Sequence, residues 1–153
     1  MNSHIEIYTD GACSGNPGAG GWAAILHIYG DSFELSGFLE RTTNNRMELL
    51  AAIKALEHIT LLNEKNRVNL HSDSKYLIDG MNLWIDGWRQ RSWRGVKNLD
   101  LWLQLDYLNL KLNVSWIWVK AHADCADNNK ADLLAKFEII KNKKKTIDSD
   151  EKD

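Results

Sequence analysis

At 153 residues, with 44% hydrophobic and 26% charged residues, the chain has the length and composition of one soluble globular domain. Its net charge of −2 gives no whole-chain sign of a nucleic-acid partner, although such binding depends on local patches. We expect neither a membrane span nor a secretory signal, because no run in this sequence has the necessary apolar length or pattern. Two cysteines without CxxC spacing favour free thiols and a cytoplasmic location.

The N-terminal part of the chain predicts three antiparallel strands. Residues 5–9 alternate in polarity and predict a strand that ends at Asp10. Residues 22–28 and 33–39 predict the second and third strands. The short connections make these strands an antiparallel meander.

A glycine-rich segment, residues 11–21, separates the first two predicted strands and contains the only proline, Pro17. It is not a P-loop, because no lysine lies between residues 1 and 53. Residues 18–23 match a loose dinucleotide-binding pattern, but a strand-like run follows them where a helix is needed. The segment is too long for a two-residue hairpin turn. We therefore expect a loop whose small residues allow another molecule to approach closely.

The rest of the chain predicts alternating helices and strands. A helix opened by Thr42 or Thr43 covers residues 44–59, where apolar side chains recur at helical spacing. The next predicted strand, residues 68–72, follows a helix and should therefore run parallel to the first strand. The remaining predicted elements are strands over 68–72 and 114–119, helices over 74–81, 99–112 and 127 to about 142, and a disordered charged tail over 141–153. Together they predict an α/β domain, residues 1–140, with a five-stranded mixed sheet and helices on both faces.

Acidic side chains follow the ends of several predicted elements. Asp10 and Asp73 end the two adjacent parallel strands at the point where the sheet changes direction, which is where open α/β sheets bind ligands. Such a pair repels unless a cation lies between them, which favours Mg²⁺ or Mn²⁺. Glu48 and Asp132 lie early in helices, where the helix dipole alone also favours an acid, and His122 ends the fifth strand. Each signal is weak, but together they predict a metal-dependent catalytic site.

Five motifs, in this order, resemble bacterial type 1 ribonuclease H over residues 4–138: YTDGACSGNPGAGGWA, RTTNNRMELLAAIKAL, HSDSKYL, GVKNLDLW, and WVKAHAD with ADLLAK. The resemblance implies a ribonuclease H-like fold and hydrolysis of the RNA strand of RNA–DNA hybrids, leaving 5′-phosphate and 3′-hydroxyl ends. It also implies a monomer with two Mg²⁺ ions, for which Mn²⁺ can substitute. The implied catalytic residues are four metal-binding acids and an assisting histidine: Asp10, Glu48, Asp73, Asp132 and His122. Ala121 and Asp124 stand where the family usually has glycines around this histidine.

The resemblance also implies contacts to the hybrid. Lys75 stands where related bacterial enzymes commonly have glutamine, so we expect an altered contact there. Four residues would contact the minor groove and its 2′-hydroxyls: Cys13, Asn16, Asn44 and Asn45. Two others would hold a phosphate of the DNA strand: Thr43 and Asn98. Residues 84–97, with a local net charge of +3, match a basic protrusion that is longer in well-known relatives, which predicts weak, salt-sensitive binding. Its contact residues would be Trp84, Trp88, Arg89, Arg91, Trp93, Arg94 and Lys97.

Three alternatives remain open. The chain could be a hybrid-binding module without catalysis, although the four acids argue against this. It could be another metal nuclease of the same fold, although the NNRMEL segment and the tryptophan-rich basic segment favour ribonuclease H. A phosphohydrolase without a nucleic-acid substrate is disfavoured by the basic segment.

Overall fold

The computed structural model describes residues 4–62, 67–121 and 124–151, with side chains described as far as residue 143. Five strands form one mixed sheet in the order β3-β2-β1-β4-β5. The first three strands pair antiparallel, and β4 and β5 run parallel to β1, which confirms the predicted sheet. The strands are β1 (Ile5–Gly15), β2 (Gly18–Ile28), β3 (Asp31–Thr42), β4 (Val68–Ser72) and β5 (Val114–Trp118).

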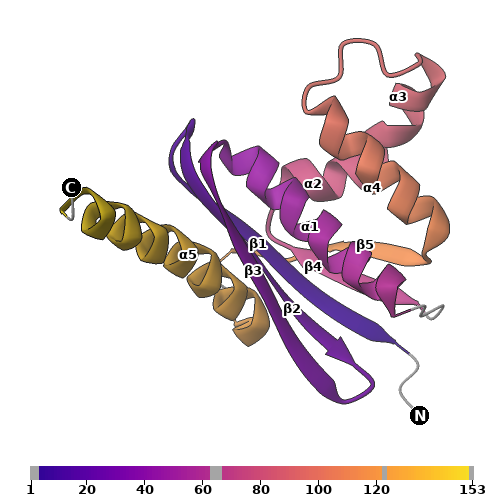
Figure 1. Cartoon of the computed structure of the whole chain (residues 1–153). Coiled ribbons are helices and arrows are strands. Elements are labelled where there is room, and N and C mark those ends of the chain that lie inside the picture. Colours follow the sequence, from indigo (N-terminus) through magenta and orange to yellow (C-terminus); the bar gives the residue numbers. More distant parts are fainter. Residues whose placement is uncertain (1–3, 63–66, 122–123, 152–153) are drawn as a thin grey trace.

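Helices cover both faces of the sheet, as predicted. Figure 1 shows α5 on one side of the long strands and α1 on the other, with α2 and α4 beyond α1. The helices are α1 (Asn44–Leu61), α2 (Lys75–Asp79), the π-helical turn η1 (Gly80–Trp84), α3 (Ile85–Gln90), α4 (Leu99–Lys111) and α5 (Ala126–Glu151). Within the described parts of the chain, none of these helices combines the length and hydrophobicity needed to cross a membrane.

The last helix is longer than its predicted end near residue 142, because α5 remains helical to Glu151. It therefore runs through the segment for which disorder was expected. The division into a catalytic domain over residues 1–140 and a separate tail stays a prediction.

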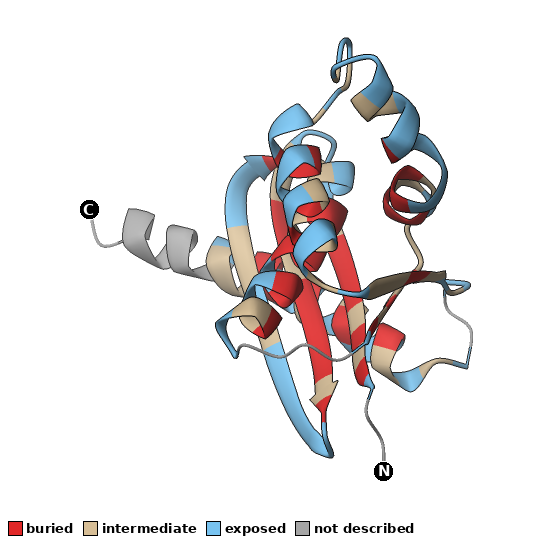
Figure 2. Cartoon of the chain, turned by 90° about the vertical axis from the view of Figure 1, so that its right-hand side faces the viewer, coloured by how far each residue is buried: buried red, intermediate tan, exposed pale blue. Residues whose placement is uncertain are grey.

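Alternating side chains build a core on each face of the sheet. Ile5 and Ile7 of β1 lie in the larger core with α1, α2 and α4. On the other face, Ala23 and Ile25 of β2 pack with Ala131 and Ala135 of α5. Figure 2 shows the buried residues gathered on the central strands and on the helices packed against them. The period of two along the strands explains why both faces are apolar here.

β1 and β2 pair continuously through the glycine-rich segment, so the predicted loop is wrong. The pairing extends to Gly15 opposite Gly18, and only Asn16 and Pro17, joined by a cis peptide bond, connect the strands. A Cβ at Gly11 would lie 2.6 Å from the Glu48 nitrogen of α1, and one at Gly21 would lie 2.1 Å from the Ala135 oxygen of α5. These two glycines therefore let helices approach the hairpin closely from opposite faces.

Candidate metal-dependent active site

The candidate site lies where β1 extends past the end of β4. The two strands pair only as far as Thr9 opposite Ser72, so Asp10 is the first β1 residue beyond this pairing and Asp73 directly follows β4. The edge of β1 is open at this point. Side chains from both faces of the sheet can therefore meet there, Glu48 from α1 and Asp132 from α5.

Three of the predicted acids converge tightly. One carboxylate oxygen from each of Asp10, Glu48 and Asp73 lies within 4.8 Å of the other two. They line a hollow of about 400 Å³, and Asp132 lines the same hollow. Lys136 holds Asp132 from the next turn of α5, at 3.0 Å between Nζ and Oδ2. All four predicted acids thus share one site, although Asp132 lies outside the tight group of three.

Burial makes the negative charge of two of these acids unfavourable. It raises the pKa of Asp10 to about 8, and the charges of Asp73 and Asp132 add to this, although a hydrogen bond with Glu48 partly offsets it. Burial and the charge of Asp10 also raise the pKa of Glu48 well above its ordinary value. The backbone nitrogen of Gly11 donates a hydrogen bond to Asp10 Oδ1 at 2.9 Å. Without a cation, burial therefore favours the protonated form of this pair.

The chemistry of the site fits a divalent cation. Glu48 is 5% exposed, so it is not the solvent-facing helix-start acid that the dipole alone would explain. Its Oε2 is buried without a hydrogen-bond partner among the described residues. No Lys or Arg of the described chain pairs with Asp10, Glu48 or Asp73. Clustered carboxylate oxygens with an unsatisfied acceptor are the ligands that hard cations prefer. His122 lies outside the described residues.

Two of the four predicted minor-groove residues line this hollow, and the other two lie in the adjoining β1–β2 hairpin. Asn44, Asn45 and Lys75 line the hollow directly. Asn16, at the tip of the hairpin, accepts a hydrogen bond from the Asn44 backbone nitrogen at 3.1 Å. Cys13 donates from Sγ to the Thr42 carbonyl oxygen at 3.4 Å. The hairpin tip is thus fixed to the start of α1, beside the acids.

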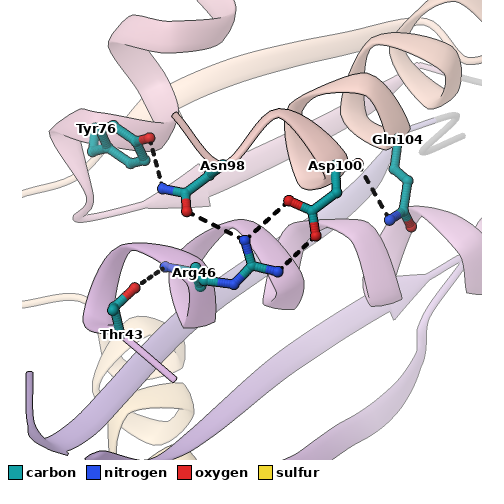
Figure 3. Close-up of polar contacts among 6 residues, drawn as sticks. All are labelled: Thr43, Arg46, Tyr76, Asn98, Asp100 and Gln104. Atoms are coloured by element: carbon teal, nitrogen blue, oxygen red, sulfur yellow. Dashed lines mark hydrogen bonds and ion pairs between the residues drawn. The ribbon is translucent and has the colours of Figure 1, made fainter. Parts of the chain in front are cut away.

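A polar network joins the two residues predicted to hold a DNA phosphate, and Figure 3 shows its members. Thr43 is the N-cap of α1 and accepts from the Arg46 backbone nitrogen at 3.2 Å. The Arg46 guanidinium donates to Asn98 Oδ1 at 3.2 Å and pairs with Asp100 at 2.7 Å. Asn98, in a left-handed conformation, donates to the Tyr76 hydroxyl at 3.0 Å. The sequence analysis missed Arg46, Tyr76 and Asp100, because their partners are remote in sequence and no local pattern marks them.

The tryptophans of residues 84–97 form a row that rests on the core. Trp88 contacts both Trp84 and Trp93, with ring centroids 6.0 and 6.1 Å apart, and meets the buried Trp102 edge-on at 4.8 Å. Arg89 forms ion pairs with Asp86 and Asp106. The exposed cations of this segment are Arg91, Arg94 and Lys97. These three exposed cations account for the segment's net charge of +3, because Arg89 is paired with acids.

Lys75 lies at the rim of the hollow, against β5. Its ammonium is 4.8 Å from the centre of the Trp118 ring, a cation–π contact. Trp118 in turn donates from Nε1 to the Asp73 carbonyl oxygen at 3.2 Å. The residue that departs from the expected glutamine thus contacts the tryptophan that binds the backbone of Asp73, one of the three clustered acids.

Comparisons with known proteins agree with this geometry. The family model for RNase H matches residues 2–140. The chain is 52% identical over 141 residues to a ribonuclease H of Mesorhizobium japonicum, covering 89% of this chain and 78% of that protein. It is 51% identical over 148 residues to a ribonuclease H of Acetivibrio thermocellus, covering 92% and 98% of the two chains.

Solved structures show the same fold. LC9-RNase H1, a type 1 RNase H with the type 2 active-site motif, has a TM-score of 0.80 and 32% identity, over 89% of this chain and 72% of that one. LC11-RNase H1, solved in complex with RNA/DNA hybrid, has a TM-score of 0.71 at 24% identity, over 90% and 97%, which is a likeness of fold alone. The ribonuclease H-like fold predicted from the motifs is confirmed, and the chain belongs to the RNase H family.

Proposed function

We infer that the chain is an endoribonuclease that hydrolyses the RNA strand of RNA–DNA hybrids. One observation carries this inference: in a member of the RNase H family, Asp10, Glu48 and Asp73 bring carboxylate oxygens within 4.8 Å of one another at the open edge of β1. A hybrid-binding module without catalysis would have no use for two adjacent acids whose pKa values are raised chiefly by burial.

The four acids would hold two Mg²⁺ ions, for which Mn²⁺ can substitute. When bound, the ions supply Lewis-acid stabilisation for the scissile phosphate and its leaving 3′ oxygen and make the attacking water more acidic. Asp10 and Glu48, which are buried, would fix the ions within the protein. Asp73 and Asp132 approach from β4 and α5 and leave the mouth of the hollow open toward a substrate.

Recognition of RNA would depend on neutral groups beside the acids. The 2′-hydroxyl both donates and accepts hydrogen bonds, which suits the side-chain amides of Asn16, Asn44 and Asn45. Thr43 uses its oxygen as the helix cap but still has a hydroxyl hydrogen to donate, so it can hold a phosphate together with Asn98. His122 would assist by moving a proton or aiding product release, since its charge is accessible near neutral pH.

The decisive experiment is cleavage of an end-labelled RNA–DNA hybrid in Mg²⁺, beside single-stranded RNA and duplex DNA of the same sequence. We expect cleavage of the hybrid RNA strand alone, loss of cleavage in EDTA, and products that ligate through 5′-phosphates. Equal cleavage of duplex DNA would favour another metal nuclease of this fold. Binding without cleavage would favour a hybrid-binding module. We expect one copy of the chain to suffice, since all four acids come from one protomer.

A further inference from the structure

The acidic hollow contains one basic side chain. Of the described residues that line it, four are acids and only Lys75 carries a positive charge. Lys75 forms no ion pair with an acid of the described chain, so its charge is not neutralised within the protein. An unpaired ammonium beside four carboxylates is therefore available to an anionic group of the substrate.

A tryptophan ring, and not an acid, holds this ammonium. Lys75 Nζ lies 4.8 Å from the centre of the Trp118 ring. Trp116, on the same face of β5, is buried in the core, whereas Trp118 is 45% exposed and lies where this face leaves the core. The face of an aromatic ring attracts a cation without cancelling its charge. The contact therefore restricts the position of Lys75 and leaves its charge intact.

The same tryptophan binds the backbone that carries Asp73. Trp118 Nε1 donates to the Asp73 carbonyl oxygen at 3.2 Å. In the sheet, Trp118 lies opposite Ser72, and the Val119 nitrogen donates to the Ser72 carbonyl oxygen at 2.9 Å. The end of β5 therefore fixes the turn between β4 and α2 through both its main chain and its indole.

The backbone of Lys75 is fixed, but its side chain depends on the tryptophan. Ser74 caps α2 by accepting from the Leu77 nitrogen at 3.2 Å, which places Lys75 as the first residue of the helix. The lysine side chain itself is exposed, and a long side chain loses much conformational freedom when a ligand orders it. Holding the ammonium before the substrate arrives reduces that loss.

A lysine at this position recognises a different group from a glutamine. A glutamine amide both donates and accepts hydrogen bonds, which suits the edge of a base. An ammonium only donates and carries a full charge, which suits a phosphate. The departure from glutamine at Lys75 therefore favours a contact to the backbone of the hybrid.

We propose that Trp118 is a positioning residue, which holds the Lys75 ammonium at the mouth of the acidic hollow so that it binds a phosphate of the hybrid. The proposal rests on the proposed function, because it concerns how the same site holds its substrate. Trp118 acts through Lys75 on binding and, through its indole N–H, on the position of Asp73. The phosphate contact carries no sequence information, so it should be equal for hybrids of different sequence.

The first test is a double-mutant cycle on hybrid affinity, with Ca²⁺ in place of Mg²⁺ and the RNA strand checked to be intact. We expect K75M to bind a hybrid of about 20 base pairs roughly fivefold more weakly at about 100 mM salt, with a salt slope lower by about 1. W118L should bind about twofold more weakly, and K75M/W118L should bind no more weakly than K75M. K75R should retain the wild-type affinity, and K75Q should match K75M.

A second cation–π pair supplies the control cycle. Lys111 Nζ lies 5.1 Å from the centre of the Tyr107 ring on α4, and neither residue lines the hollow. K111M, Y107L and their combination should leave affinity and salt slope unchanged. Wild-type affinity in K75M, or an equal loss on adding W118L to K75M and to the wild type, would overturn the proposal. A loss in K75M that varies with hybrid sequence would indicate a base contact and would also overturn it.

Cleavage in Mg²⁺ separates the two contacts of Trp118. W118F keeps an aromatic face without the indole N–H, so we expect a lower kcat with KM near the wild-type value. K75M should raise KM while kcat stays within about twofold. If the wild-type chain cleaves the hybrid and K75M and W118L have unchanged KM, this inference fails and the proposed function stands. If the wild-type chain binds the hybrid without cleaving it, the proposed function fails, and the affinity cycle alone decides whether Trp118 positions Lys75.

Discussion

When charged, the buried acids Asp10 and Glu48 lower the stability of the metal-free folded chain. The same two carboxylates are positioned to bind a cation. Burial raises the pKa of Asp10 to about 8, far above the roughly 3.9 of an exposed aspartate. Because the folded state holds the proton more tightly than the unfolded chain, the stability linked to this group is complete below about pH 4. It is lost as the pH rises toward 8. The same direction holds for Glu48.

Asp10→Asn should therefore abolish cleavage and stabilise the metal-free protein. The amide has a similar shape but carries no charge, so the variant loses a metal ligand together with the repulsion. We expect the free energy of unfolding in EDTA to rise by about 1–3 kcal/mol at pH 8, and to change little at pH 4. Urea denaturation at the two pH values measures this. Asp31→Asn, at the exposed first residue of β3, is the matched control and should leave both stability and cleavage unchanged.

At the scale of elements, the close contact between β2 and α5 depends on Gly21. A Cβ at this position would lie 2.1 Å from a backbone oxygen of α5, which cannot move without moving the helix that carries Asp132. We expect Gly21→Ala to lower the free energy of unfolding by about 1–3 kcal/mol and to reduce kcat. Gly87→Ala in α3, where an added Cβ meets nothing within 4 Å, is the control and should be neutral or slightly stabilising. Equal stability of the two variants would contradict this interpretation.

The start of α2 and the start of α4 are joined through one hydroxyl. Tyr76 accepts hydrogen bonds from the buried Trp102 Nε1 at 3.1 Å and from Asn98 Nδ2 at 3.0 Å. Tyr76→Phe leaves the indole N–H without its partner, which should cost about 1–3 kcal/mol of stability. It also releases Asn98, so KM for the hybrid should rise more than kcat falls. Tyr107→Phe, at an exposed position on α4, should change neither.

The strands and helices were predictable where one residue pattern determines them, as for β4 and α1. The long β1–β2 hairpin was not, because nothing within residues 11–21 shows that helices cover both faces. Glycine there indicates a loop when read locally, whereas Gly11 and Gly21 are required by contacts with residues 37 and 114 positions away. The acids were recognisable from the order of motifs. The Arg46–Asp100 pair was not, since it joins residues 54 positions apart.

At the scale of the whole molecule, the site is assembled from parts that depend on one another. Asp10 comes from β1, Glu48 from α1, Asp73 from the end of β4 and Asp132 from α5, so only the complete fold brings the four carboxylates together. A cation that binds this arrangement binds the folded state and not the unfolded chain. Binding must therefore stabilise the entire domain.

Mg²⁺ should accordingly raise the unfolding temperature of the wild-type chain in a concentration-dependent way. At a concentration one hundred times the dissociation constant, the stabilisation is about 2.7 kcal/mol. Because the cation replaces the proton retained by Asp10 and Glu48, the shift should be larger at pH 8 than at pH 5. Thermal unfolding in Mg²⁺ and in EDTA, with Asp10→Asn beside the wild type, measures this coupling. A shift of the same size in Asp10→Asn would mean that the cation binds elsewhere. A shift confined to the wild type would mean that metal binding, proton binding and folding stability all depend on the same two buried acids.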